Sequence, residues 1–236
     1  MDMLSGKVTG VIGAMEQELA LLKGAAQIRR KIVRAGMEFH VGTLGGAEAV
    51  IVQCGIGKVN AGLCVQILAD EFHVTHVVNT GVAGSLDDRL RIGDIVISAD
   101  AVQHDYDISP LGFRKGEIPY TGLYAFPADA ALRRRALEAA KGAIDASVSV
   151  YEGRVCSGDQ FISDAAVTAR IIREFGGLCC EMEGAAIAQA SYLNGLPFVI
   201  VRAISDSSDG ESPASFEKFT AQAAANCAAI VRGMLK

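Results

Sequence analysis

Phe198-Val-Ile-Val-Arg-Ala-Ile-Ser-Asp206 is a nearly uncharged run in which Arg202 is the one charge before the terminal aspartate. Near-continuous apolar runs of this kind are typical of parallel strands whose two faces are covered by helices. In open α/β sheets, ligands bind just beyond the carboxyl ends of the strands. The sequence therefore predicts a buried strand over 198–204 and places Asp206 at a ligand-binding edge.

A second acidic group, Glu181-Met182-Glu183, interrupts an equally apolar stretch upstream of this strand and precedes a helical run that Gly184 opens. Carboxylates in an apolar neighbourhood are costly unless other groups pair with them. Taken alone, Glu181 fits an acidic residue at a helix N-terminus, where the helix dipole favours negative charge, as well as it fits a functional site. Glu183 together with Arg202 and Asp206 indicates a functional site.

Strand and helix patterns alternate along the whole chain. Strands are expected at 7–15, 39–44, 47–54, 74–80, 94–101, 147–157 and 198–204, and helices at 16–24, 59–71, 129–141, 168–175, 185–194 and 216–235. Gly45-Gly46 is a two-residue hairpin signal between two of the strands. This alternation predicts one α/β domain over residues 1–236 with a mixed sheet.

The connection 107–126 is long and rich in Gly, Pro and aromatic residues. Loops of such length inside a compact domain are usually functional.

The overall composition narrows the classes of partner. Of 236 residues, 50% are hydrophobic, and the net charge of −5 argues against nucleic acid or an anionic membrane as the main partner. The apolar runs are too short to span a bilayer, and the N-terminus lacks the pattern of a signal peptide. We expect a cytoplasmic protein.

The cysteines and histidines do not form a recognisable metal site. No Cys-x-x-Cys pair occurs, and no His lies at zinc-ligand spacing from a Cys. We interpret the cysteines as reduced, structural residues, expect no metal, and interpret the four histidines as structural, with His104 closest to the long loop.

The common catalytic motifs are missing as well. Gly55-Ile-Gly-Lys58 is not a phosphate-binding Walker loop, and no Gly-x-Gly-x-x-Gly follows the first strand. What remains is a set of carboxylates at strand ends and helix starts: Glu18, Glu183 and Asp206. Separated carboxylates can divide acid and base roles, accept hydrogen bonds from sugar hydroxyls and stabilise an oxocarbenium-like transition state. The residues alone are compatible with chemistry at a glycosidic bond, and inference from them stops there.

A series of short motifs carries a resemblance to a known family. In order they are Ile12-Gly-Ala-Met-Glu-Gln-Glu18, Cys54-Gly-Ile-Gly-Lys-Val59, Asn79-Thr-Gly-Val-Ala-Gly84, Gly93-Asp-Ile-Val96, Ser157-Gly-Asp-Gln-Phe-Ile162, Glu181-Met-Glu183 and Val201-Arg-Ala-Ile-Ser-Asp206. Across nearly the whole chain this set resembles the bacterial 5′-methylthioadenosine/S-adenosylhomocysteine nucleosidases of the nucleoside phosphorylase superfamily. The resemblance implies a three-layer α/β/α sandwich with a mixed central β-sheet, assembled as a homodimer.

The resemblance also implies the reaction. Such an enzyme hydrolyses the N-glycosidic bond of 5′-methylthioadenosine, S-adenosylhomocysteine and also 5′-deoxyadenosine, which releases adenine. It serves methionine salvage and the recycling of S-adenosylmethionine by-products, and it uses no cofactor.

The catalytic roles implied by the resemblance fall on five residues. Asp206 would protonate adenine N7, Glu18 would activate the attacking water, and Glu183 would hold the ribose hydroxyls. Arg202 and Ser205 would position the catalytic carboxylates.

The implied binding residues surround the nucleoside. Phe161 would stack on adenine, the backbone of Ile162 would read its N1/N6 edge, and Met182 and Gly84 would pack against the substrate. The apolar 5′ pocket would be built from Met15, Ile56 and Phe216, together with Ile108, Phe113 and Pro119 from the 107–126 loop of the neighbouring subunit.

Val82 departs from the family pattern, in which a small polar residue is expected at this position. The departure puts one contact to the ribose in doubt. Phe113 stands where Tyr also occurs, which suits an apolar pocket equally well.

Three alternatives stay open. A purine nucleoside phosphorylase would need cationic or N–H partners for phosphate. Glu16 and Glu18 would repel that dianion, although Arg29, Arg30, Arg34 and Arg89 leave the point open. A futalosine-type hydrolase shares the mechanism and differs in pocket shape. A non-enzymatic nucleoside-binding or storage protein is the third, because fold does not fix function, but binding alone requires neither Glu18 nor Asp206.

Overall fold

The computed structural model describes residues 6–206 and 212–236, with the backbone alone over 212–218. The strands are β1 (Val8–Gly13), β2 (Gln27–Arg34), β3 (Met37–Leu44), β4 (Ala47–Gln53), β5 (His76–Ser85), β6 (Ile95–Gln103), β7 (Phe126–Pro127), β8 (Val150–Ser157), β9 (Cys179–Glu181) and β10 (Phe198–Asp206). The helices are α1 (Glu16–Ala25), α2 (Lys58–Phe72), α3 (Ala130–Ala143), α4 (Ala165–Phe175), α5 (Gly184–Leu193) and α6 (Ser212–Met234), with a 3₁₀ turn η1 (Ser109–Leu111).

One mixed sheet runs through the molecule in the order β10-β6-β8-β9-β5-β1-β4-β3-β2. Strand β10 also pairs with β5, so that β5, β10, β6, β8 and β9 close into a ring. Strands β4, β1, β5 and β10 are mutually parallel neighbours, and their carboxyl ends therefore lie along one edge.

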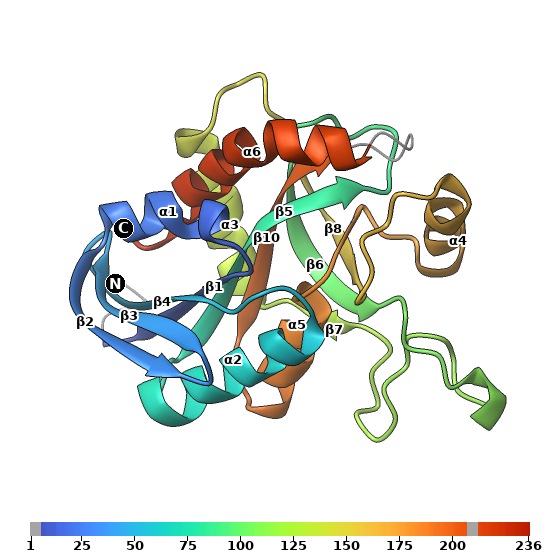
Figure 1. The fold of residues 1–236 in the computed structure, drawn as a ribbon, viewed down its shortest axis with the longest axis horizontal. Helices are drawn as coiled ribbons and strands as arrows, with labels where there is room; N and C mark the ends of the chain where they lie inside the picture. Colours follow the sequence, from blue (N-terminus) through green and yellow to red (C-terminus); the bar gives the residue numbers. More distant parts are fainter. Residues whose placement is uncertain (1–5, 207–211) are drawn as a thin grey trace.

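Helices cover both faces of this sheet, with α1, α3 and α6 on one side and α2 and α5 on the other (Figure 1). Successive residues of a strand alternate between the two faces. Val11 and Val199 pack with the first set of helices, whereas Ile12 and Ile200 pack with the second. The predicted three-layer α/β/α sandwich with a mixed central sheet is confirmed.

The predicted hairpin is also confirmed: β3 and β4 pair antiparallel across Gly45-Gly46, where both glycines have positive φ. The 107–126 segment is a long connection as expected, interrupted only by η1 and one isolated bridge before β7.

Strand β2 was not expected from the sequence. Its residues are exposed or half-buried along both faces, and Arg29, Arg30, Lys31 and Arg34 remove the apolar alternation that reveals a strand. Among the described strands it pairs only with β3, and it forms the edge of the sheet, where charged residues protect against aggregation. The short strands β7 and β9 were missed because they are too brief to show a pattern.

Strand β5 is longer than predicted. The expected strand ended at residue 80, but the observed strand continues to Ser85. It does so because β10 pairs with it from Gly81 to Gly84, with a register shift at Ser205, and β9 pairs with Gly84 and Ser85.

All six cysteines are buried and free, as expected of reduced structural residues. Over the part of the chain that the structure describes, no helix combines the length and apolar character needed to cross a membrane.

Candidate active site

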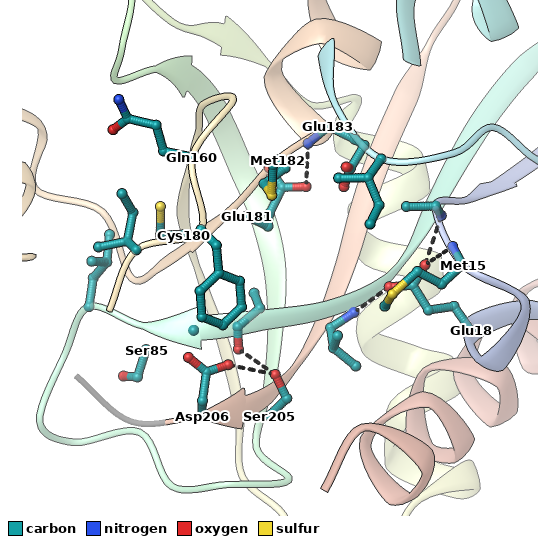
Figure 2. Close-up of a pocket in the computed structure, with 18 of the residues that line it drawn as sticks. Met15, Glu18, Ser85, Gln160, Cys180, Glu181, Met182, Glu183, Ser205 and Asp206 are labelled. Carbon is teal, nitrogen blue, oxygen red and sulfur yellow. Dashed lines mark hydrogen bonds between the residues drawn. The ribbon is translucent and has the colours of Figure 1, made fainter. Parts of the chain in front are cut away.

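A pocket opens at the carboxyl ends of β1, β5 and β10 and at the start of α5 (Figure 2). Segments far apart in the sequence meet there because the strands that lead to it are parallel neighbours. The predicted site residues that line it are Met15, Glu18, Ile56, Gly84, Phe161, Ile162, Met182, Glu183, Ser205 and Asp206, and Val82, which departs from the family pattern, lines it as well. Its walls thus combine three of the predicted carboxylates with apolar side chains.

Glu18 lies in the first turn of α1, and its carboxylate turns back toward the end of β1. One oxygen, Oε2, accepts hydrogen bonds from the N–H groups of Ala14 (2.7 Å) and Met15 (2.9 Å), and Oε1 accepts one from Val82 (3.1 Å). Burial raises the pKa of Glu18, against the opposing effects of Arg202 and these N–H groups. The carboxylate is therefore fixed in position and more basic than an ordinary glutamate, which suits a proton acceptor.

Asp206 ends β10 beside a β-bulge. Ile204 pairs with Ala83 and Asp206 with Gly84, so the register shifts by one residue at Ser205. Bulges of this kind redirect side chains near active sites. The Ser205 hydroxyl lies 2.7 Å from Asp206 Oδ1, which orients the carboxyl group (Figure 2). A Cβ atom on Gly84 would lie 2.8 Å from Asp206 Oδ2, so glycine makes room for the carboxyl group.

Glu183 precedes α5 directly and makes no capping bond to that helix. Its Oε1 instead accepts a hydrogen bond from the N–H of Gly57 (2.8 Å), which directly precedes α2. Burial, reinforced by the nearby charge of Glu181, raises the pKa of Glu183 to about 7. This carboxyl group therefore changes charge near neutral pH.

Arg202 lies beneath the pocket and is fully buried. Its Nη2 donates to Asn79 Oδ1 (2.6 Å) and to Glu181, and it lies 3.8 Å from Glu183 Oε2. Its Nη1 lies 4.0 Å from Glu18 Oε1. Although burial acts to lower the pKa of Arg202, the surrounding carboxylates outweigh it and raise that pKa. One permanent cation thus faces three carboxylates.

The close approach of Glu18 and Arg202 depends on Gly81. A Cβ atom at this position would collide with Arg202 Nη1 and with Glu18 Oε1. Glycine here is required by the two side chains that pass over it and not by a turn.

Glu181 belongs to this network, and its contacts were not predicted. It ends β9, lines the pocket and accepts hydrogen bonds from Ser157 Oγ, from Arg202 and from the N–H of Gly184 (2.8 Å). Glu181 is therefore more than an acidic residue at a helix N-terminus, because it also binds Arg202 and Ser157. The signal in the sequence was a carboxylate directly after two apolar cysteines, but its partner Arg202 could not be read from spacing.

We expect Arg202→Met to lower the free energy of unfolding by about 3–5 kcal/mol, because it leaves buried carboxylates without their cation. Urea denaturation measures the change. Arg173→Met is the matched control, since the Arg173 side chain is 71% exposed and should tolerate the substitution. A loss no larger for Arg202→Met than for the control would contradict the role of Arg202 as the shared counter-charge.

The remaining predicted residues do not line this pocket. Ile108, Phe113 and Pro119 lie on the 107–126 connection, away from the walls formed by their own chain. Phe216 lies in α6 where only the backbone is described, so the prediction for its side chain falls outside the described residues.

The fold and a pocket of carboxylates at parallel strand ends define a class of protein: residues 8–236 match the family model described as the phosphorylase superfamily. The chain is 41% identical to a 5′-methylthioadenosine/S-adenosylhomocysteine nucleosidase of Treponema pallidum, over 96% of this chain and 92% of the relative. It therefore belongs to the 5′-methylthioadenosine/S-adenosylhomocysteine nucleosidase family within that superfamily.

Solved structures agree with this membership. The Neisseria meningitidis 5′-methylthioadenosine/S-adenosylhomocysteine nucleosidase, in complex with methylthio-immucillin-A, superimposes with a TM-score of 0.93 at 37% identity, covering 98% of this chain and 99% of that one. The futalosine hydrolase of Helicobacter pylori gives a TM-score of 0.91 at 30% identity, covering 97% of both chains. The fold alone does not separate these two activities.

Proposed function

We propose that this chain hydrolyses the N-glycosidic bond of 5′-methylthioadenosine and S-adenosylhomocysteine, and releases adenine and the thio-substituted ribose. The observation that carries the proposal is the gathering of Glu18, Glu183 and Asp206 around one pocket. Membership of the nucleosidase family supports the same substrates. 5′-Deoxyadenosine is a further proposed substrate, and methionine salvage with recycling of S-adenosylmethionine by-products is the proposed role.

In this proposal the carboxylates divide the reaction between them. Asp206 donates a proton to adenine N7, so that the base leaves as a neutral molecule, and Ser205 orients that carboxyl group. Glu18 takes the proton of the attacking water, for which its buried, hydrogen-bonded carboxylate is suited. Glu183 accepts hydrogen bonds from the ribose hydroxyls, and its negative charge stabilises the oxocarbenium-like sugar.

The proposed contacts to the base and the sugar come from residues that line the pocket. Phe161 stacks on adenine, and the backbone of Ile162 bonds its edge. Gly84 and Met182 pack against the nucleoside. Val82 lines the pocket with an apolar side chain, and its backbone N–H donates to Glu18 Oε1.

Water fits this pocket better than phosphate as the attacking group. Among the described residues that line the pocket there is no Lys or Arg side chain. Arg29, Arg34 and Arg89 form ion pairs with surface carboxylates instead. A phosphate dianion in this pocket would meet no cationic side chain among those lining residues and would be repelled by Glu18. This arrangement supports hydrolysis over phosphorolysis.

A panel of nucleosides tests the substrate. We expect adenine release from 5′-methylthioadenosine and S-adenosylhomocysteine with a higher kcat/KM than base release from futalosine, since the apolar side chains of Met15 and Ile56 border the pocket. The reverse order would assign the chain to futalosine hydrolysis. Binding of all three without release of a base would favour a nucleoside-binding protein.

The proposed assembly is a homodimer in which the 107–126 loop completes the neighbour's 5′ pocket. Exposed apolar side chains support a subunit contact: Ile56 at the pocket rim is 54% exposed, Val59 is 74% exposed, and Leu111 in the loop is 74% exposed. Ile108, Phe113 and Pro119 of that loop would act in the partner subunit's pocket. Sedimentation analysis should give the mass of two chains, and a monomer that retains full activity would overturn the shared pocket.

The raised pKa of Glu183 predicts that nucleoside binding depends on pH. The ionised carboxylate accepts hydrogen bonds from both ribose hydroxyls, and ionisation increases as pH rises through about 7. Affinity for 5′-methylthioadenosine, measured calorimetrically in an Asp206→Asn background to prevent turnover, should rise roughly tenfold from about pH 6 to about pH 8. Free adenine lacks the ribose and serves as the control. An unchanged pH dependence in the added Glu183→Gln variant would contradict the assignment.

A further inference from the structure

The first turn of α2 holds two carboxylates that come from different parts of the chain. The N–H of Gly57, which precedes the helix, donates to Glu183 Oε1 (2.8 Å), and the N–H of Lys58 donates to Asp159 Oδ1 (2.7 Å). The first N–H groups of a helix have no partner within it and attract negative charge. This helix start therefore joins the proposed ribose-binding carboxylate to the segment that leads into Phe161.

Lys58 stands at a position that its charge does not favour, because the helix dipole repels a cation at the first turn. Its Nζ is held by Asp105 Oδ1 (2.6 Å) and Gln103 Oε1 (3.0 Å) at the end of β6. The side chains of Lys58 and Asp105 are only 18% and 16% exposed. The ion pair is thus largely withdrawn from solvent, unlike the ordinary surface pairs of this protein.

Asp105 completes a closed loop of contacts. Its second oxygen, Oδ2, accepts a hydrogen bond from the N–H of Asp159 (2.8 Å). Burial acts to raise the pKa of Asp105, but Lys58 and the Asp159 N–H outweigh it and lower that pKa, so the carboxylate is ionised at neutral pH. Asp159 is therefore held by two hydrogen bonds: its N–H donates to Asp105, and its side chain accepts from the N–H of Lys58.

We propose that Lys58 and Asp105 are positioning residues that fix the spacing between the ribose-binding Glu183 and the purine-binding loop 158–162. The inference rests on the proposed function, because it takes Phe161 and Ile162 as contacts to the base. Neither Lys58 nor Asp105 lines the pocket, so the pair acts through the segments that it joins. Loss of the ion pair should weaken binding of the nucleoside more than it slows the chemical step.

The test compares Lys58→Met, Asp105→Asn and the double variant in the full-length protein, with Lys31→Met as control. Lys31 lies on the edge strand β2 and forms an exposed pair with Glu38 of β3, so its loss removes a lysine without touching the pocket. Two readouts are measured: kcat and KM for 5′-methylthioadenosine, and amide hydrogen exchange of residues 158–162 in the ligand-free protein.

We expect KM to rise about tenfold in each single variant, as for loss of a charge-assisted hydrogen-bonded pair, while kcat changes by less than about threefold. The double variant should add less than about twofold, because the second substitution removes a partner already lost. Exchange at 158–162 should be faster in all three variants and unchanged in Lys31→Met.

Unaltered exchange at 158–162 would overturn the inference, and so would a fall in kcat with KM unchanged. The exchange readout needs no substrate, so it decides the positioning role even if the wild-type chain released no adenine, an outcome that would reject the proposed function separately.

Discussion

Replacing Asp206 with Asn is expected to lower kcat for 5′-methylthioadenosine by about 10²–10⁴-fold, the usual contribution of a general acid, while the nucleoside still binds. Asn has nearly the same shape, and its carbonyl oxygen can still accept the hydrogen bond of Ser205, which lies 2.7 Å from Asp206 Oδ1. It can donate a hydrogen bond to N7 but cannot transfer a proton. The base would then have to leave as an anion.

Single-turnover kinetics and calorimetric binding separate the two effects. Asp129→Asn is a matched control: Asp129 caps α3 by accepting hydrogen bonds from Ala131 and Leu132, and Asn caps helices equally well. Turnover within a few-fold of the wild type in Asp206→Asn would remove Asp206 from the role of acid.

The Glu18→Gln variant is expected to lose hydrolysis to a similar extent, about 10²-fold or more, because an amide cannot accept the proton of the attacking water. The side-chain NH₂ group would also face a backbone donor, since Glu18 Oε2 is bonded to Ala14 and Met15 and Oε1 to Val82. Some loss of stability should therefore accompany the loss of rate.

Thermal unfolding and adenine binding measured beside the rate show whether the variant remains folded with a formed base pocket. Glu16→Gln is the control, because Glu16 lies in the same turn of α1 and its side chain is 57% exposed. If Glu18→Gln hydrolysed the substrate as fast as Glu16→Gln, the base would have to be another group.

The sequence predicted most of the fold because most elements are buried on at least one face. The apolar run of β10 and the hairpin of β3 and β4 follow directly from burial and turn chemistry. Strand β2 was not predicted because it is an exposed edge strand that is held in place by backbone pairing with β3. The continuation of β5 through Gly81 was not predicted for a related reason, since its partner strand β10 is distant in sequence.

The candidate site was predictable to the extent that strand ends share an edge. That rule, with the family resemblance, brought Glu18, Glu183 and Asp206 to one pocket. Contacts between side chains depend on register and on the bulge before Asp206, which the sequence does not reveal. Glu181 is the clearest case, because its bond to Arg202 joins two strands of a closed ring.

The network beneath the pocket explains how several carboxylates can be buried together. Arg202 supplies one positive charge, and Glu18, Glu181 and Glu183 each accept hydrogen bonds from backbone N–H groups, with a further one from Ser157 Oγ to Glu181. Partners of this kind reduce the cost of burying charge without neutralising it. The pocket therefore keeps several carboxylates close together, and burial raises the pKa of two of them, Glu18 and Glu183.

The most direct test of the central claim is the fate of water in the reaction. Purified protein is incubated with 5′-methylthioadenosine in water enriched in a heavy oxygen isotope, with and without phosphate, and the sugar product is identified by mass spectrometry. Hydrolysis predicts adenine and free methylthioribose that carries the heavy oxygen, at a rate independent of phosphate. An unlabelled sugar 1-phosphate, formed only when phosphate is present, would show that the chain is a phosphorylase and that Glu18 does not activate water.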